Sequence, residues 1–143
     1  MSAVPLPATP ALAVDCVVVD RAKRVLLIRR RNPPFQGCLA LPGGFVDIGE
    51  TVEDACRREL FEETGHKVGR LTLVGVYSRP DRDPRGHTCS VAFLARARST
   101  KVAAADDALA AEWVGDWRRA KLAFDHREII ADAARLLQAR VRP

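Results

Sequence analysis

The chain has 143 residues, of which 48% are hydrophobic, and it carries a formal net charge of +5 at pH 7. These values predict one domain with a folded core, and they exclude a membrane-spanning protein because no apolar run reaches transmembrane length. The basic balance suits an anionic small-molecule substrate, and it is also compatible with RNA.

The cysteines indicate a reducing environment. They lack the C-x-x-C spacing of zinc sites, and the N-terminus shows no secretory signal pattern. Two of them fall in apolar, strand-like runs, so we expect buried free thiols and a cytoplasmic location. The four positions are Cys16, Cys38, Cys56 and Cys89.

The first part of the chain predicts a short lead-in followed by a hairpin. Residues 1–10 contain three prolines and are expected to be flexible or extended, so a single domain is predicted over residues 11–143. Residues 12–19 and 24–28 are apolar and β-branched with a turn between them, and they predict two paired strands. A proline-containing loop then leads through residues 39–45 into a glycine turn.

The next segment predicts a helix with defined ends. Thr51 is a suitable N-cap, and Asp54 lies three residues later, as in a capping box. Residues 52–64 contain no proline or glycine, and Gly65 stands where helices commonly end in a left-handed residue. We therefore expect a helix over residues 52–64.

The remainder predicts further strands and a terminal helix. Strands are expected at residues 71–78, 88–97 and 112–114, with a polar loop over 79–87 and a weakly patterned stretch over 102–111. Asp125 and Glu128 resemble a capping box at the start of a helix over residues 125–140. Strands on both sides of one helix, followed by a second helix, indicate an α/β fold with a mixed sheet between helices.

Three glutamates on the first helix form an unusual cluster. At about 100° per residue, Glu59 and Glu63 fall within the apolar stripe and Glu62 borders it. Carboxylates at these spacings repel one another, and turning them toward a core adds a desolvation cost. A solvated acidic face is one alternative, and a salt-bridge network with Arg57 is another, although Arg57 points to the far side. A divalent cation held by oxygen ligands fits best.

The segment from Gly44 to Gly65 resembles the box of the Nudix hydrolases. The pattern is Gly, five residues, Glu, seven residues, and then Arg-Glu-aliphatic-any-Glu-Glu-any-Gly-aliphatic. The matching positions are Gly44, Glu50, Arg58, Glu59, Leu60, Glu62, Glu63 and Gly65. His66 replaces the usual aliphatic residue at the last position. The resemblance implies an α/β/α sandwich and hydrolysis of a nucleoside diphosphate linked to another group.

The resemblance also implies roles for the box residues. The metal ligands it implies are Glu59, Glu62, Glu63 and the backbone at Gly43, and the cofactors are two or more magnesium or manganese ions. Arg58 would orient an acid through an ion pair, and Glu50 would support the site. Glu62 or Glu63 would accept a proton from the attacking water, unless a metal-bound hydroxide needs no separate base.

Several shorter segments resemble the ADP-ribose pyrophosphatase branch of the Nudix family. They are Leu12-Ala13-Val14-Asp15, Asn32-Pro33-Pro34-Phe35, Arg82-Asp83-Pro84-Arg85-Gly86-His87 and Ala123-Phe124-Asp125-His126. This branch implies cleavage of ADP-ribose to AMP and ribose 5-phosphate. The candidate substrate contacts are Arg29, Tyr77, Arg82, Arg85 and His126. Strand-end charge for Arg29, core packing for Tyr77 and helix polarity for His126 are the alternatives.

Other functions stay open at this point. Related sequences often carry an acid where this chain has Ala110, and Asp106, Asp107 or Glu112 is a nearby substitute, so the general base is undetermined. The box would equally serve a pyrophosphohydrolase for normal or oxidised nucleoside triphosphates, or an ADP-ribose-sensing regulatory module. Nucleic acid is disfavoured because the arginines alternate with acids and no aromatic stacking set accompanies them. Family members are often dimers, so we expect a homodimer.

Overall fold

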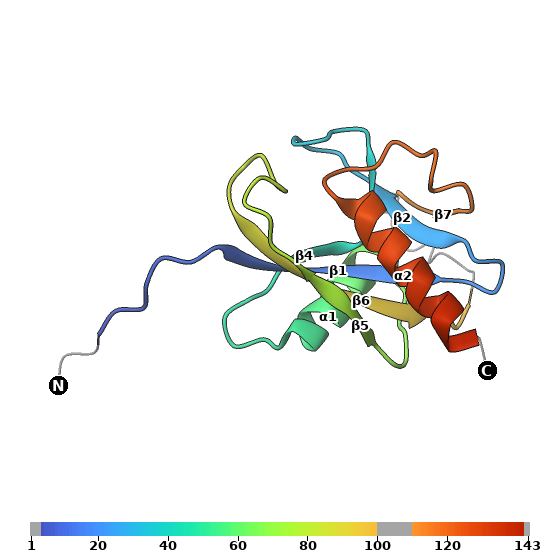
Figure 1. Ribbon diagram of the computed structural model, residues 1–143, viewed down its shortest axis with the longest axis horizontal. Coiled ribbons are helices and arrows are strands. Elements are labelled where there is room, and N and C mark those ends of the chain that lie inside the picture. Colours follow the sequence, from blue (N-terminus) through green and yellow to red (C-terminus); the bar gives the residue numbers. More distant parts are fainter. Residues whose placement is uncertain (1–3, 100–109, 142–143) are drawn as a thin grey trace.

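A computed structural model describes residues 4–99 and 110–141, and within these ranges the chain forms seven strands and two helices (Figure 1). The strands are β1 (Ala11–Val19), β2 (Val25–Arg29), β3 (Leu39–Ala40), β4 (Gly43–Phe45), β5 (Thr72–Tyr77), β6 (Thr88–Arg96) and β7 (Ala111–Val114). The helices are α1 (Val52–Thr64) and α2 (His126–Val141). Residues 4–10 are exposed and extend away from the sheet (Figure 1).

Strand β1 lies at the centre of a single mixed sheet. It runs parallel to β6 along its whole length, and antiparallel to β2 and β4. The strand order is β3-β2-β1-β6-β5, with β4 also paired to β1 and β7 paired to β2. The mixed sheet predicted from the sequence is therefore confirmed.

The alternating side chains of β1 divide the core into two layers. Val17 packs in one apolar cluster with Ile129 of α2, whereas Val18 packs in another with Leu60 of α1. All four side chains are at most 1% exposed. The two helices thus cover opposite faces of the sheet, which confirms the α/β/α sandwich (Figure 1).

Helix α1 has the predicted bounds because both of its ends are capped. The Thr51 hydroxyl accepts a hydrogen bond from the Asp54 backbone N–H at 3.0 Å, and Gly65 takes the left-handed conformation at φ 73°. At the other helix, Asp125 directly precedes α2, and its carboxylate accepts two hydrogen bonds from Arg82. This ion pair ties the start of α2 to the loop before β6.

The segment before α1 contains two short strands that the sequence pattern does not predict. Strand β4 pairs with β1, where Gly43 lies opposite Asp15 and Phe45 lies opposite Ala13. A strand of three residues with two glycines has no alternating apolar pattern to reveal it. The pairing nevertheless decides where the glycine turn sits. Residues 100–109, with Asp106 and Asp107, lie outside the described residues.

The four cysteines are all free thiols. Cys16, Cys38 and Cys56 are buried, but Cys89 is half-buried, so its expected burial is wrong. Cys89 pairs with Leu12 near the beginning of both strands, and Leu12 is itself 42% exposed because this end of the sheet extends beyond the core. No helix in the described part of the chain is long and apolar enough to cross a membrane.

Candidate active site

Helix α1 turns two of its three clustered acids toward the sheet. Glu59 and Glu63 share a face with the buried residues Cys56 and Leu60, and both are half-buried. Glu62 keeps 56% of its side chain exposed at the edge of this face. The helical period therefore places the acids as predicted, with Glu62 nearest to solvent.

Arg58 is the shared cation of this acidic group. Its guanidinium donates to both oxygens of Glu50 at 2.7 and 2.8 Å, to Glu59 at 2.9 Å and to Glu62 at 3.3 Å. The hydrogen bonds from Arg58 lower the pKa of Glu50 to about 2, and they raise the pKa of Arg58. Arg58 thus fixes the positions of Glu59 and Glu62, while Glu50 holds Arg58.

Glu63 has no such cation. Among residues 4–99 and 110–141 it forms no ion pair, and its buried Oε2 atom has no hydrogen-bond partner. Burial, a hydrogen bond with Glu59 and the charge of Glu59 raise the pKa of Glu63 to about 9, against the opposing effect of the Gly43 backbone N–H. The burial of Glu63 beside Glu59, with no cation between them, therefore disfavours the charged form of Glu63.

The glycine pair in β4 lets the backbone approach these acids closely. A Cβ atom at Gly44 would lie 2.6 Å from the Glu59 carboxylate, and one at Gly43 would lie 2.1 Å from the Val14 carbonyl oxygen. Neither position accepts a side chain without a displacement. The backbone of β4 thus lies directly against the acidic face of α1.

The donor set fits a hard divalent cation. In the part of the chain that the structure describes, no three acidic, histidine or cysteine side chains already converge in a coordination geometry. The unpartnered Oε2 of Glu63, beside the Glu59 carboxylate, is nevertheless an atom that a cation would satisfy. The available oxygen donors are Glu59, Glu62, Glu63 and the backbone at Gly43.

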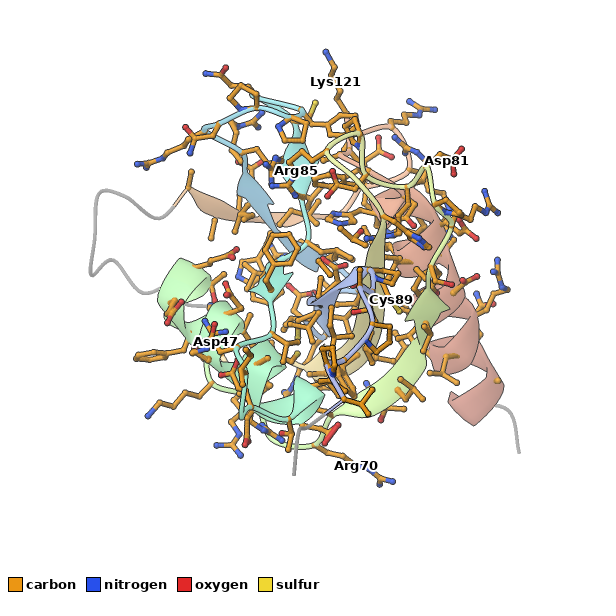
Figure 2. The ribbon with its side chains drawn as sticks, turned by 90° about the vertical axis from the view of Figure 1, so that its left-hand side faces the viewer. Asp47, Arg70, Asp81, Arg85, Cys89 and Lys121 are labelled. Atoms are coloured by element: carbon orange, nitrogen blue, oxygen red, sulfur yellow. The ribbon has the colours of Figure 1, made fainter. Side chains whose placement is uncertain are left out.

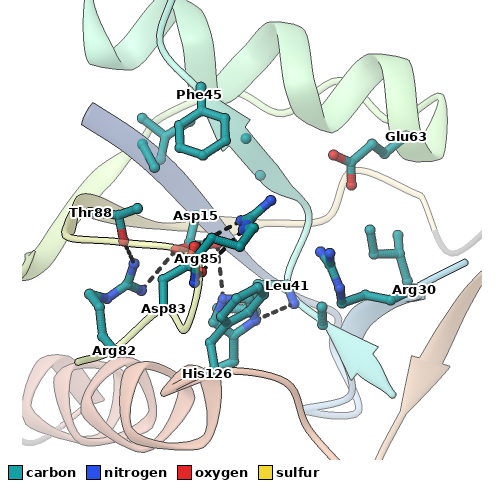
Figure 3. A pocket seen from close by; sticks show the side chains of 17 residues that line it. Asp15, Arg30, Leu41, Phe45, Glu63, Arg82, Asp83, Arg85, Thr88 and His126 are labelled. Carbon is teal, nitrogen blue, oxygen red and sulfur yellow. Dashed lines mark hydrogen bonds and ion pairs between the residues drawn. The ribbon is translucent and has the colours of Figure 1, made fainter. Parts of the chain in front are cut away.

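A pocket opens beside Glu63 (Figure 3). Its lining includes Gly43, Gly44 and Phe45 from the box side, and Arg30, Arg82, Asp83, Arg85, Phe124 and His126 from other segments. Figure 3 shows Glu63 of α1 and Arg30 entering it from different sides. In Figure 2, Arg85 lies in the upper middle of the view and Asp47 lies beside α1, the pale green helix. The fold thus brings the box and the predicted substrate loop to one pocket.

Asp15 is the centre of a buried polar network in the floor of this pocket. Its carboxylate accepts a hydrogen bond from the Ser90 hydroxyl at 2.5 Å and lies 3.3 Å from Nε2 of His126. His126 Nδ1 accepts the Leu41 backbone N–H at 3.0 Å, so Nε2 carries the hydrogen that faces Asp15. Both ring nitrogens of His126 therefore have internal partners, and the ring positions the segments that it joins (Figure 3).

Two other predicted substrate contacts also have internal partners. Arg82 is 5% exposed and donates to both oxygens of Asp125, at 2.9 and 2.7 Å, and to the Thr88 hydroxyl. Tyr77 donates to Asp132 of α2 at 2.6 Å and is not part of the pocket lining. The geometry gives Arg82 a structural role in the pocket wall, and it favours the packing alternative for Tyr77.

Arg85 and Arg30 present guanidinium groups to the pocket. Arg85 donates to both oxygens of Asp83, at 3.1 and 2.8 Å, which lowers the pKa of Asp83. It also lies over the rings of Phe45 and Phe124, and Arg30 lies over Phe124. Burial, followed by the charge of Arg85, lowers the pKa of Arg30. Two cations thus lie near the same ring, with guanidinium carbons 5.0 Å (Arg30) and 5.8 Å (Arg85) from the Phe124 centroid.

Arg29 does not line the main pocket, but it lines a second pocket together with Arg30. This second pocket is lined by Ile28, Arg29, Arg30, Arg31, Asn32, Glu62, Glu63 and Ala110. Arg29 lies 3.6 Å from Glu112, the acid closest to Ala110 in the described sequence. Glu112 is therefore engaged by a cation at the rim, and it is not grouped with the box acids.

The sequence analysis missed several of the residues that line the main pocket, among them Asp15, Arg30, Phe45 and Asp83. Asp15 does carry a signal, because it is the only charged residue in the apolar run over residues 12–19. Arg30 is the middle one of three consecutive arginines, and the sequence does not tell which one faces inward. Asp83 lies in the segment from Arg82 to His87 that resembles the ADP-ribose pyrophosphatase branch, but Phe45 has no comparable signal.

Comparison with known proteins agrees with this geometry. Residues 9–133 match the NUDIX domain family. The chain belongs to the Nudix family. It is 51% identical over 126 residues to the ADP-ribose pyrophosphatase of Methanocaldococcus jannaschii, across 88% of this chain and 74% of that protein. Nudix hydrolases are typically dependent on divalent metal ions, in agreement with the oxygen donors on α1.

Two further relatives respond to ADP-ribose or bind it. This Nudix hydrolase is 32% identical over 145 residues to the ADPR responsive transcriptional repressor NtrR of Acinetobacter baylyi, across 94% of this chain and 57% of the repressor. It superposes with a TM-score of 0.82 on the NUDIX domain of Shewanella oneidensis NrtR complexed with ADP ribose, at 29% identity, covering 91% and 90% of the two chains.

Proposed function

We propose that this Nudix hydrolase cleaves ADP-ribose to AMP and ribose 5-phosphate with bound magnesium or manganese ions. The observation that carries the proposal is the unpartnered, buried oxygen of Glu63, which lies beside Glu59 at the edge of a pocket that holds two guanidinium groups. A diphosphate supplies the negative charge that guanidinium groups bind. The 51% identity to an ADP-ribose pyrophosphatase supports the choice of substrate.

Some side chains of the pocket would bind the diphosphate, and others would activate the attacking water. Arg30 and Arg85 face the pocket, and Arg30 would bind diphosphate oxygens. Bound metal ions would offset phosphate charge and lower the pKa of a coordinated water. Glu63 or Glu62 would accept a proton as the water oxygen attacks phosphorus and the phosphoanhydride bond breaks. The departing phosphate oxygen keeps the electron pair of that bond.

We also propose a substrate class, a cellular compartment and an oligomeric state for the enzyme. A small nucleotide is the substrate, because the arginines around the pocket alternate with acids such as Asp83 and leave no continuous basic track for a nucleic acid. The free thiols support a reducing compartment such as the cytoplasm. A homodimer is the proposed assembly, and light scattering on the purified protein measures it.

A substrate panel tests the proposed reaction. ADP-ribose, dGTP and 8-oxo-dGTP are incubated separately with the enzyme and magnesium, and products are identified by mass spectrometry. We expect AMP and ribose 5-phosphate from ADP-ribose, with the highest kcat/KM of the panel, and loss of turnover in excess EDTA. Monophosphate and pyrophosphate from a triphosphate at a higher kcat/KM would favour the nucleoside triphosphate alternative. Undiminished turnover in EDTA would reject metal dependence.

The repressor relatives support a second candidate, an ADP-ribose-sensing module. Its basis is the likeness to NtrR and to the ADP-ribose-bound NrtR domain. A sensor binds ADP-ribose saturably but forms no product at enzyme concentrations equal to those of the substrate. Single-turnover measurement therefore separates the two candidates.

A further inference from the structure

The pocket contains an aromatic cluster that the hydrolytic chemistry does not use. Phe124 packs against Phe35 with ring centroids 4.9 Å apart, and against the His126 ring at 5.2 Å. Phe45 lines the same pocket from β4 and is 45% exposed. Large rings on the lining of a charged pocket offer flat apolar surfaces to a ligand.

Two of these rings are carried by an unfavourable backbone. The φ angles of Phe35 and Phe124 are 59° and 52°, in the left-handed region that bulky residues rarely adopt. Backbone strain of this kind persists where the surroundings enforce it, and it gathers at ligand sites. The strain at Phe124 therefore adds to the evidence that this ring is placed for a ligand.

Arg85 covers the cluster in the present arrangement. Its guanidinium carbon lies 5.6 Å from the Phe45 ring centroid and 5.8 Å from that of Phe124, and Figure 3 shows Arg85 directly beneath Phe45. Asp83 is 5% exposed and anchors Arg85 through both carboxylate oxygens. The Arg85 side chain is itself 49% exposed, so it has room to swing outward about this anchor.

A second cation makes this cover unfavourable. Arg30 also lies over Phe124, with its guanidinium carbon 5.0 Å from the ring centroid. Two guanidinium groups near one ring repel each other, and the charge of Arg85 acts on Arg30. Outward movement of Arg85 relieves that repulsion and exposes the rings.

We propose that Phe124 and Phe45 form the stacking site for the base of the nucleotide, and that Arg85 is its removable cover. This proposal rests on the proposed function, and it assigns the base to the aromatic cluster and the diphosphate to the side of Glu63. Stacking of a base on an aromatic ring is stronger than a solvent-exposed cation–π contact, so an incoming base displaces the guanidinium.

The cover and the phosphate-ligand roles of Arg85 make opposite predictions for an uncharged ligand. Adenosine carries the base but no phosphate, so removal of a competing cover tightens its binding. If Arg85 only binds phosphate, the same removal leaves adenosine binding unchanged. Ribose 5-phosphate carries the phosphate but no base, and it reports on the other side of the pocket.

Calorimetric titration of the full chain with adenosine and with ribose 5-phosphate tests the proposal. We expect Arg85→Ala to bind adenosine about threefold more tightly, and Phe124→Leu to bind it about tenfold more weakly with ribose 5-phosphate unaffected. The matched controls are Arg79→Ala, a 76% exposed arginine on the same loop, and Phe61→Leu, a 50% exposed ring on α1. Both controls should bind adenosine as the wild type does.

Unchanged or weaker adenosine binding by Arg85→Ala would overturn the proposal, as would a lack of adenosine binding in both the wild type and that variant. If Phe124→Leu does not fold, Phe45→Leu replaces it, with weaker adenosine binding expected. Adenosine has no phosphoanhydride to cleave, so these results do not depend on turnover. An enzyme that binds adenosine as expected but leaves ADP-ribose intact would disprove the proposed function and keep the stacking site.

Discussion

The two sides of the pocket are built in different ways. On the box side, one capped helix carries Glu59, Glu62 and Glu63 within two turns, so helix geometry alone sets their spacing. On the opposite side, Arg30 and Phe124 come from segments far apart in the chain and meet only in the folded protein. The groups for the chemistry are therefore encoded locally, whereas those for substrate selection depend on tertiary packing.

The difference predicts which kinetic parameter responds to each change. Substitutions on the box side should lower kcat and leave the fold intact, because the acids are not needed for packing. Substitutions on the other side should change KM or stability. The changes below test this division, beginning with the largest expected effect.

Glu63→Gln should lower kcat for ADP-ribose by about a hundredfold or more, because it removes an anionic metal donor. The melting temperature should not fall. Burial raises the pKa of Glu63, so its charged form is already unfavourable and a neutral amide is no worse there. Steady-state kinetics with magnesium measure the effect. Glu53→Gln, at an exposed position in the first turn of α1, is the control. Near-normal turnover by Glu63→Gln would show that the assigned role is wrong.

Gly44→Ala should lower kcat by about tenfold with little change in stability. The new Cβ atom would meet the Glu59 carboxylate at 2.6 Å, and the flexible end of that side chain would move away from its donor position. Gly75→Ala is the matched control, because its Cβ atom would meet Tyr77 at an ordinary 3.6 Å. Equal kcat values for the two variants would contradict the close approach of β4 to α1.

Arg30→Ala should raise KM for ADP-ribose by about tenfold and change kcat little, because Arg30 faces the main pocket. Arg29→Ala should have a smaller effect, since Arg29 pairs with Glu112 at the rim of the second pocket. Parallel KM measurements on the two variants compare neighbouring arginines of equal charge. A larger effect at Arg29 would reverse the assignment.

Tyr77→Phe should lower the free energy of unfolding by about 1 kcal/mol and leave kcat/KM for ADP-ribose unchanged. The lost hydroxyl donates to Asp132 of α2 and not to the pocket. Urea denaturation and steady-state kinetics measure the two quantities. Higher KM with unaltered stability would instead make Tyr77 a substrate contact.

His66→Val should make stability less dependent on pH. His66 is buried, and burial lowers its pKa from the ordinary value of 6.5. As the pH falls below 6.5, His66 therefore becomes protonated more readily in the unfolded chain than in the folded chain. The stability that neutral His66 contributes is therefore present above that pH and is lost as the pH falls. Between pH 7.5 and 5.5 the wild type should therefore lose more stability than the variant, measured by urea denaturation at each pH. Parallel losses in both proteins would contradict this assignment.

The sequence predicts the box side of the pocket better than the opposite side. The bounds of α1 are correct because Thr51 and Gly65 act within the helix itself. The pairing of β4 with β1 and the choice of Arg30 over Arg29 are missed, because each depends on contacts between distant segments. For the same reason, the predicted substrate contact Arg82 has a carboxylate partner that no local pattern reveals.

The central claim is that the acids of α1 hold a divalent cation, and manganese binding tests it without any turnover. Titration of the wild type, Glu53→Gln and Glu63→Gln with Mn²⁺, followed by electron paramagnetic resonance, measures the bound ion. We predict equal affinity for the first two proteins and at least about tenfold weaker binding for Glu63→Gln. Manganese binding of the same strength in all three would contradict the claim.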